Sequence, residues 1–181
     1  MVLRDYLIAR VRKGFVANLE YRPNDDMSFY WRNIFNRYED TELQREITYD
    51  YRGGDLENQT ATSGVFTEGE GERANSERYE IQEILSSSLG GEFEFDEWTL
   101  SVSATYGETE QDTPYDNFYA FELDEEIPMA YDTSNYYWNV SAGSEFEDPD
   151  NFEFSETSRG GQLIQEEIRV FQTDLRRDLF F

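Results

Sequence analysis

Carboxylates are the residues of this chain that could most readily do chemistry. Of its 181 residues, 40 are acidic and 15 basic, and neighbouring carboxylates recur, as in Asp25-Asp26 and Asp124-Glu125-Glu126. Such pairs serve in acid–base catalysis only beside a partner group at a defined place, and the sequence shows none. The chain has no histidine and no cysteine, which removes the commonest general base, thiolate chemistry and most zinc sites. We therefore expect no catalytic residue, no metal and no cofactor, and we do not expect an enzyme.

Aromatic side chains offer a second kind of chemistry, the stacking of a flat ligand. Aromatic residues make up 17% of the chain, and one long polar stretch holds several of them. Aromatic faces stack on sugar rings and catecholate-like groups, and loop positions favour capture of a ligand. The alternative is that these rings pack the stretch against itself. The candidate ligand-binding residues are Tyr115, Tyr119, Tyr136, Tyr137 and Trp138, for a small molecule that the sequence does not identify.

The net charge of the chain limits its partners. At −25 it lacks the basic surface that phosphate binding needs, so nucleic acid is excluded as a partner. A disordered acidic protein would share this charge but would lack the aromatic residues. Two interpretations of the acidity stay open: solvated loops, or an acidic mouth that collects cations.

A strand pattern begins near residue 15. Apolar residues occupy every second position, in the order Phe15, Ala17, Leu19 and Tyr21. Period two indicates a strand with one apolar and one polar face, and the run 23–26 (Pro-Asn-Asp-Asp) supplies turn chemistry. We predict strands at about 12–22 and 27–38, although Asn33 and Ile34 break the second alternation. The polar positions expected to line a barrel lumen are Asn18, Glu20, Arg32 and Asn36.

A second hairpin follows the same pattern. Apolar residues at even spacing predict a strand at about 79–95, and Asp96-Glu97 makes a tight turn. The next strand, at about 98–107, places Trp98, Leu100, Val102, Ala104 and Tyr106 on one face and Thr99, Ser101, Ser103 and Thr105 on the other. Its aromatic ends and aliphatic middle are typical of a strand that crosses a membrane. A fifth strand is predicted at about 163–181.

The connections between these strands differ strongly in length. Tight turns alternate with long polar loops at about 39–78 and 108–162, as in membrane barrels, where one rim carries turns and the other loops. A β-sandwich does not sort its connections in this way. The predicted fold is therefore all-β, an antiparallel up-and-down meander of about five long strands. It would form part of a transmembrane β-barrel in the bacterial outer membrane, with short periplasmic turns and long extracellular loops.

Several residue runs resemble one family in particular. These runs are 10–14 (Arg-Val-Arg-Lys-Gly), 18–26 (Asn-Leu-Glu-Tyr-Arg-Pro-Asn-Asp-Asp), 29–32 (Phe-Tyr-Trp-Arg), 87–92 (Ser-Ser-Leu-Gly-Gly-Glu) and 174–178 (Asp-Leu-Arg-Arg-Asp). Their order resembles the N-terminal part of the barrel of TonB-dependent outer-membrane receptors. The resemblance touches all five predicted strands but neither long loop. It implies uptake of a scarce nutrient, such as a ferric siderophore or a saccharide.

The resemblance also implies partners outside this chain. They are outer-membrane lipid, the remainder of the barrel, the plug domain, and TonB acting through that plug. The family's signal peptide and plug are expected to be absent from residues 1–181, which would make the chain a fragment of a receptor. Two other functions remain alternatives: a plug-free porin-type barrel, and a soluble carbohydrate-binding β-sandwich.

Overall fold

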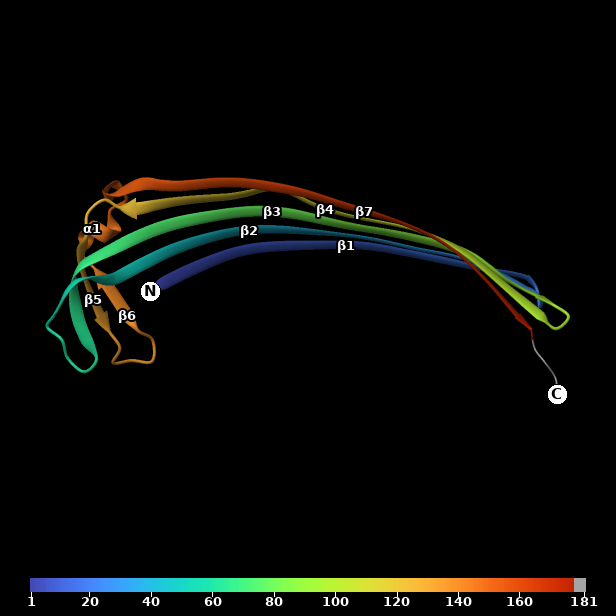
Figure 1. Cartoon of the computed structure of the whole chain (residues 1–181), viewed down its shortest axis with the longest axis horizontal. Coiled ribbons are helices and arrows are strands. Elements are labelled where there is room, and N and C mark those ends of the chain that lie inside the picture. The colour runs from blue at the N-terminus through green and yellow to red at the C-terminus, as the bar shows by residue number, and fades with distance from the viewer. Residues whose placement is uncertain (178–181) are drawn as a thin grey trace. The chain divides into compact units, whose positions relative to one another are not determined.

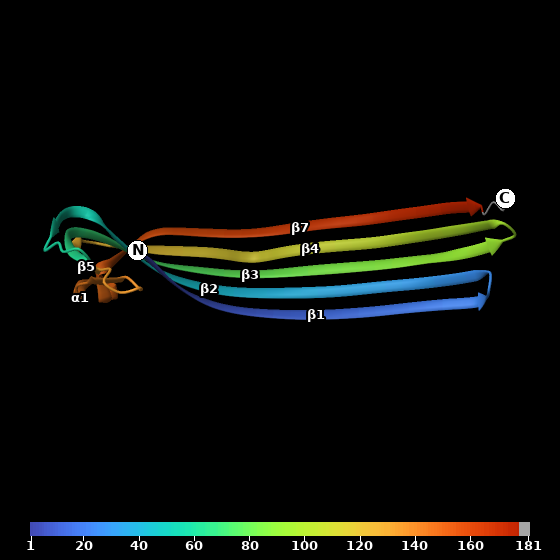
Figure 2. The same cartoon turned by 90° about the horizontal axis from the view of Figure 1, so that it is seen from below.

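The chain folds as an open antiparallel β-sheet. The computed structural model describes residues 1–177, and 84% of it is strand. The long strands are β1 (Val2–Asn24), β2 (Met27–Glu57), β3 (Ser63–Phe95), β4 (Trp98–Leu123) and β7 (Phe152–Arg177). They pair in the order β1-β2-β3-β4-β7 (Figure 1, Figure 2), which confirms the predicted all-β meander of five long strands. Within the described residues the sheet is not closed, because β1 and β7 each pair with a neighbour on one side only.

Contacts divide the chain into two compact units, each containing segments of all five long strands. Unit 1 comprises Met1–Ala9, Thr41–Arg78 and Tyr115–Gly160. Unit 2 comprises Arg10–Asp40, Tyr79–Pro114 and the stretch from Gly161, which is described to Arg177. The predicted strand residues Leu179, Phe180 and Phe181 lie outside the described part of the chain.

The tight turns of unit 2 lie where the sequence predicts them. Between β1 and β2, the Asn24 side-chain oxygen accepts a hydrogen bond from the Asp26 N–H at 3.2 Å. Between β3 and β4, Asp96 has a φ of 54°, a left-handed conformation that aspartate tolerates better than most residues. The backbone N–H of Glu94, near the end of β3, donates to the Asp26 carbonyl at 2.8 Å, so the first turn is also bound to the neighbouring strand.

Unit 1 adds short elements to its segments of the long strands. Between β4 and β7 come β5 (Ile127–Asp132), β6 (Asn139–Ala142), the single helical turn α1 (Ser144–Glu147) and the 3-10 turn η1 (Pro149–Asn151). Strand β5 pairs with β3 on one side, with Val65 opposite Ala130, and with β6 on the other, with Tyr131 opposite Val140. Among residues 1–177 no helix is long and apolar enough to cross a membrane.

A small core holds unit 1 together. Ile127, Met129 and Phe146 are buried, and Ile47, Tyr49, Tyr51, Leu123, Ala142 and Phe152 pack around them. The Phe146 ring stacks on Tyr49 at 4.5 Å and meets Phe152 edge-on at 5.5 Å. The Arg73 guanidinium lies 4.5 Å from the Phe152 ring centre and donates to the Phe146 carbonyl.

The prediction of long loops at 39–78 and 108–162 is wrong for most of these residues, which form strands instead. Strand β2 continues to Glu57 and β3 begins at Ser63, so only 58–62 connect them; β4 continues to Leu123 and β7 already begins at Phe152. Glycine and glutamate made 68–72 look like a loop. In the fold Gly69 lies against Met129 and Gly71 against Phe146, where a β-carbon would come within 2.6 and 2.3 Å of those side chains. Glycine is present here because the core needs the room.

Candidate functional site

The sheet of unit 2 has two chemically different faces. On the first, which we call the apolar face, rings from three neighbouring strands meet near the turns. Tyr21 stacks on Phe29 at 6.4 Å, and Phe29 meets Phe93 edge-on at 5.4 Å. Alternation from these rings assigns to the same face Phe15, Leu19, Trp31, Leu85, Leu89, Leu100, Val102, Ala104, Tyr106, Phe171 and Leu175.

Charged pairs border the apolar face away from the turns. On the same side of the sheet, Lys13 lies 3.8 Å from Glu39, and Arg37 lies 2.7 Å from Glu39 and 2.5 Å from Glu83. On β4, the apolar stretch ends at Tyr106, which follows Trp98 by eight positions. At ~3.4 Å per residue this stretch is about 27 Å long. The apolar face is therefore a band of apolar side chains. Its edge near the turns is aromatic, and its opposite edge, away from the turns, is charged.

Nothing within residues 1–177 covers this band. The buried hydrophobic residues of the described chain are Ala74, Ala120, Ile127, Met129 and Phe146, and all of them belong to unit 1. On the apolar face, by contrast, Leu19 is 61% exposed and Phe171 is 75% exposed. Exposed apolar surface of this extent marks an interaction with a membrane or another protein.

The opposite side of the sheet, the polar face, carries hydrogen bonds between side chains. Ser88 and Thr105 lie 2.9 Å apart, and Ser101 donates to Glu92 at 3.3 Å. The four residues predicted to line a lumen lie on this face by alternation, and two of them pair. Arg32 lies 3.9 Å from Glu20, and its guanidinium covers the Tyr30 ring at 4.5 Å.

The remaining two predicted lumen residues lie on the same face without joining that pair. Asn36 is beside Gly14, with its side-chain oxygen 3.8 Å from where a β-carbon would be, and Asn18 is exposed on β1. The break at Asn33 in the β2 alternation has a local explanation. On the apolar side, the Asn33 amide donates to the Ala17 carbonyl at 3.4 Å, so its polar group has a partner.

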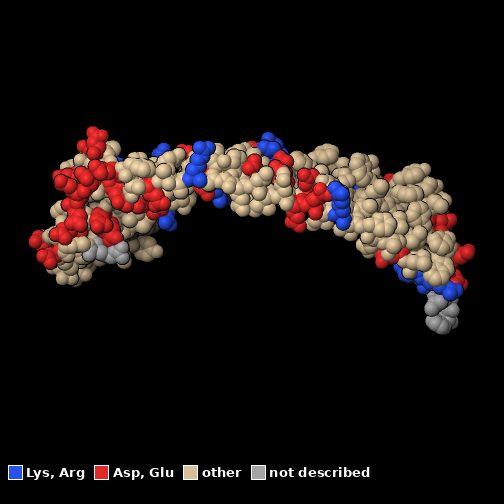
Figure 3. All heavy atoms as spheres, turned by 45° about the horizontal axis from the view of Figure 1, so that its top comes forward, with Lys and Arg blue, Asp and Glu red and all other residues tan. Residues whose placement is uncertain are grey.

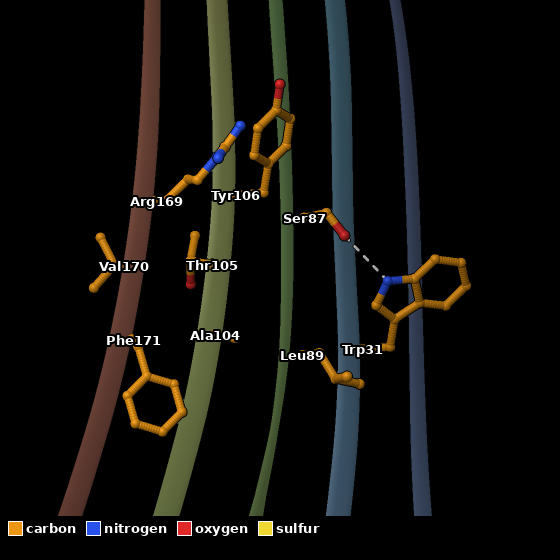
Figure 4. Close-up of a pocket in the computed structure, with 9 residues that line it drawn as sticks. All are labelled: Trp31, Ser87, Leu89, Ala104, Thr105, Tyr106, Arg169, Val170 and Phe171. Carbon is orange, nitrogen blue, oxygen red and sulfur yellow. Dashed lines mark hydrogen bonds between the residues drawn. The ribbon is translucent and has the colours of Figure 1, made fainter.

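A hollow of about 800 Å³ lies in the apolar face (Figure 4). It crosses β2, β3, β4 and β7 and is lined by Trp31, Ser87, Leu89, Ala104, Thr105, Tyr106, Arg169, Val170 and Phe171. The Trp31 indole N–H donates to the Ser87 hydroxyl at 3.1 Å, and the Arg169 guanidinium lies 6.0 Å from the Tyr106 ring centre. The sequence did not single out Arg169, because a polar residue between apolar ones gives no signal until the neighbouring strands are placed.

The predicted ligand-binding aromatics are divided between two places in unit 1. Tyr136, Tyr137 and Trp138 form the tip of the β5–β6 hairpin and are 91%, 83% and 64% exposed, with the two tyrosine rings edge-on at 5.1 Å. Below the tip, Thr133 donates two hydrogen bonds to the Thr62 carbonyl. The other two candidates, Tyr115 and Tyr119, lie four residues apart on β4. The structure therefore brings together the hairpin-tip rings.

Carboxylates surround a second hollow, of about 400 Å³, in unit 1. Its lining includes Asp50, Glu70, Glu72, Glu122, Asp124 and Glu126. Burial raises the pKa of Glu72, and the charges of Glu122, Glu46 and Glu156 raise it further. Figure 3 shows acidic side chains crowded over the part of unit 1 that holds β5, β6 and α1. No group of three or more acidic side chains among the described residues is arranged to hold a metal ion.

Comparison with known proteins does not assign this chain to a family: no protein-family model matches it, and no curated protein matches it. Ideas about its function therefore depend on the two faces of unit 2, the hairpin tip and the residue runs of the sequence.

Proposed function

We propose that this chain forms part of a transmembrane β-barrel in the bacterial outer membrane, within a TonB-dependent receptor that takes up a scarce nutrient. The uncovered apolar band of unit 2 carries the proposal. Its edge near the turns is aromatic (Tyr21, Phe29 and Phe93), its middle on β4 is aliphatic (Leu100, Val102 and Ala104), and its other edge is charged. Lipid-facing strands of outer-membrane barrels have this profile, because rings favour the interface and aliphatic side chains favour the hydrocarbon.

The length of the band also supports a membrane. Barrel strands cross the hydrocarbon in ~9–11 residues at a tilt of ~45°, and the β4 stretch from Trp98 to Tyr106 falls within this length. A soluble β-sandwich would instead need a second sheet on the apolar face. The short elements of unit 1 pack on a core of their own, around Met129 and Phe146.

Strands beyond β1 and β7 are required by this proposal. In a bilayer every backbone N–H and C=O must be paired within the protein, so a spanning sheet has to close. We propose that other strands of the same barrel pair with β1 and β7. The polar face, with its Glu20–Arg32 pair, would then line a lumen that holds the plug through which TonB acts. The residue runs around the 18–26 turn support this family over a plug-free porin.

The nutrient itself would first meet unit 1. The exposed rings of Tyr136, Tyr137 and Trp138 offer stacking surfaces at the end of a hairpin, which suits capture of a sugar or another flat solute. The acidic surface around Glu72 disfavours anions by charge repulsion.

Cysteine scanning tests the membrane location, because the chain has no cysteine of its own. Single cysteines at positions 100 to 105 of β4, within the closed barrel that the proposal requires, would be treated with a water-soluble maleimide, in lipid vesicles and in buffer without lipid. We expect protection at 100, 102 and 104 and labelling at 101, 103 and 105, with protection only when lipid is present. Equal protection without lipid would support the β-sandwich, and uniform labelling would contradict a membrane face.

A growth assay tests the receptor function. Disrupting the gene should slow growth when the transported nutrient limits it, and disrupting TonB should slow growth equally, without further loss when both are disrupted. A porin-type barrel would continue to pass its solute without TonB, so TonB-independent uptake would overturn this assignment.

A further inference from the structure

We infer that the tip of the β5–β6 hairpin binds an organic cation of the quaternary ammonium class, and that the captured nutrient carries such a group. This inference rests on the proposed function, because it names the chemical class of the ligand for the same rings. The site consists of the exposed side chains of Tyr136, Tyr137 and Trp138. The carboxylate of Asp132 lies at the base of the tip, where Asp132 pairs with Asn139.

The two tyrosine rings of the tip form a corner. The rings of Tyr136 and Tyr137 are edge-on, at an interplanar angle of 89°, and both side chains are highly exposed, so faces of both rings are open to solvent. A cation within ~6 Å of the centre of such a face is attracted by the negative charge of the π system. The N-methyl groups of a quaternary ammonium can contact two perpendicular rings at once, whereas a sugar stacks on a single flat face.

Other rings of the chain already have a cation over them. Arginine guanidinium groups lie 4.5–6.0 Å from the ring centres of Tyr30, Tyr38, Trp98, Tyr106, Phe146 and Phe152. Within residues 1–177, no lysine or arginine lies over a ring of the hairpin tip in this way. The tip therefore offers ring faces to a cation that comes from outside the chain.

The charge around the tip is negative. Between Tyr115 and Gly160 the sequence has one basic residue, Arg159, among many acidic ones, and Figure 3 shows acidic side chains gathered over β5 and β6. Hydrogen bonds from the Ser134 hydroxyl and the Ser134 backbone N–H, the latter at 2.8 Å, lower the pKa of Asp132, so this carboxylate stays charged at neutral pH. A negative field attracts a cation, repels an anion and does neither to a neutral sugar.

Hydrogen bonds hold the hairpin tip in place before a ligand arrives. The Thr133 backbone N–H and hydroxyl both donate to the Thr62 carbonyl, at 2.8 and 3.0 Å. The Thr62 N–H in turn donates to the Thr60 hydroxyl at 3.2 Å. The tip is thus anchored to the connection between β2 and β3, and less ordering is needed when the cation binds.

Choline and its uncharged carbon isostere, 3,3-dimethylbutanol, test the inference because they share a shape and differ in charge. The full chain, within the closed barrel that the proposal requires, would be labelled with fluorotryptophan and reconstituted in lipid. Fluorine NMR would follow the Trp138 resonance, identified by its loss in Trp138→Phe, during titration with choline, the isostere or glucose. We expect choline to bind about fivefold more tightly than the isostere, as suits a cation–π contact at an exposed site, and more tightly than glucose.

Variants of the tip separate the rings from the carboxylate. Tyr136→Leu and Tyr137→Leu should each bring the affinity for choline toward that of the isostere, whereas Tyr136→Phe and Tyr137→Phe keep the rings and should preserve the preference. Asp132→Asn retains an oxygen that can accept the Ser134 N–H, and it should weaken choline about twofold without changing the isostere. The matched control is Glu147→Gln, which removes an exposed carboxylate of α1 instead and should change neither probe.

Each outcome answers a separate question. Equal binding of choline and the isostere would overturn the inference of a cation, while capture by the rings and the receptor function would stand. Tighter binding of glucose than of choline would overturn it in favour of a neutral sugar. A choline preference that survives both leucine variants would overturn the assignment to these rings. Failure of the receptor proposal would appear instead as TonB-independent uptake, which this titration does not involve.

Discussion

Truncation of Phe146 should loosen unit 1 selectively. Phe146 is 3% exposed, and its ring contacts Tyr49, Phe152, Gly71 and the Arg73 guanidinium. It is the only large side chain that α1 contributes to the core of unit 1. Its loss should therefore free the β5–β6 region from the long strands while leaving the turns of unit 2 unchanged.

The expected cost follows from the burial of the ring. Replacing a buried phenylalanine with alanine costs ~3–5 kcal/mol, so the amides of β5 and β6 should exchange with solvent at least about a hundredfold faster, up to the stability of the unit. Hydrogen exchange read by mass spectrometry would measure this locally. Tyr136→Ala, which truncates a ring that is 91% exposed, is the matched control and should leave exchange unchanged.

A substitution at Gly71 tests the same packing more specifically. A β-carbon at Gly71 would lie 2.3 Å from the Phe146 ring, so Gly71→Ala should cost about 1–3 kcal/mol as an overpacked contact. In the Phe146→Ala background the ring that would clash is absent, so Gly71→Ala should change the free energy of unfolding little. Additive effects in this double-mutant cycle, or equal exchange in Phe146→Ala and Tyr136→Ala, would refute the packing that we describe.

Three further predictions address the membrane face, the acidic hollow and the hairpin tip. Within the closed barrel, Leu100→Lys should reduce insertion into vesicles by about 2–4 kcal/mol, whereas Ser101→Lys on the polar face should be tolerated; equal insertion yields would contradict the assigned faces. The pKa of Glu72 is raised in the fold, so unit 1 should gain stability as the pH falls from this raised pKa toward the ordinary pKa of a glutamate. Glu72→Gln should remove this gain, and hydrogen exchange measured at several pH values would show it. Tyr137→Ser should lower nutrient uptake without changing thermal stability, and unchanged uptake would exclude the ring from binding.

Local patterns predicted unit 2 well. The turns at 23–26 and Asp96-Glu97 follow from residues that favour turn conformations, and the two faces follow from alternation at period two. The Glu20–Arg32 pair could be placed on the polar face for the same reason. What alternation could not show was which side chains meet across strands, and so the hollow lined by Ala104 and Arg169 was missed.

Unit 1 was predicted poorly because its signals are not local. The sequence suggested a strand piece near Tyr49 but placed it within a loop, since charged and glycine-rich segments around it looked irregular. In the structure these segments are strands whose glycines make room for Met129 and Phe146. The aromatic candidates were found by composition, yet only the fold separated the exposed hairpin-tip rings from those on β4.

Sequence alone determined the all-β class, the positions of the tight turns and the two-faced character of unit 2, because these depend on neighbours in the chain. Tertiary structure alone decided the lengths of the strands, the core of unit 1 and the hollows of both units. Each of these depends on contacts between residues far apart in sequence, such as Tyr49 with Phe146 and Phe29 with Phe93. The energy of such contacts appears only when the sheet places those residues together, so no local pattern records it.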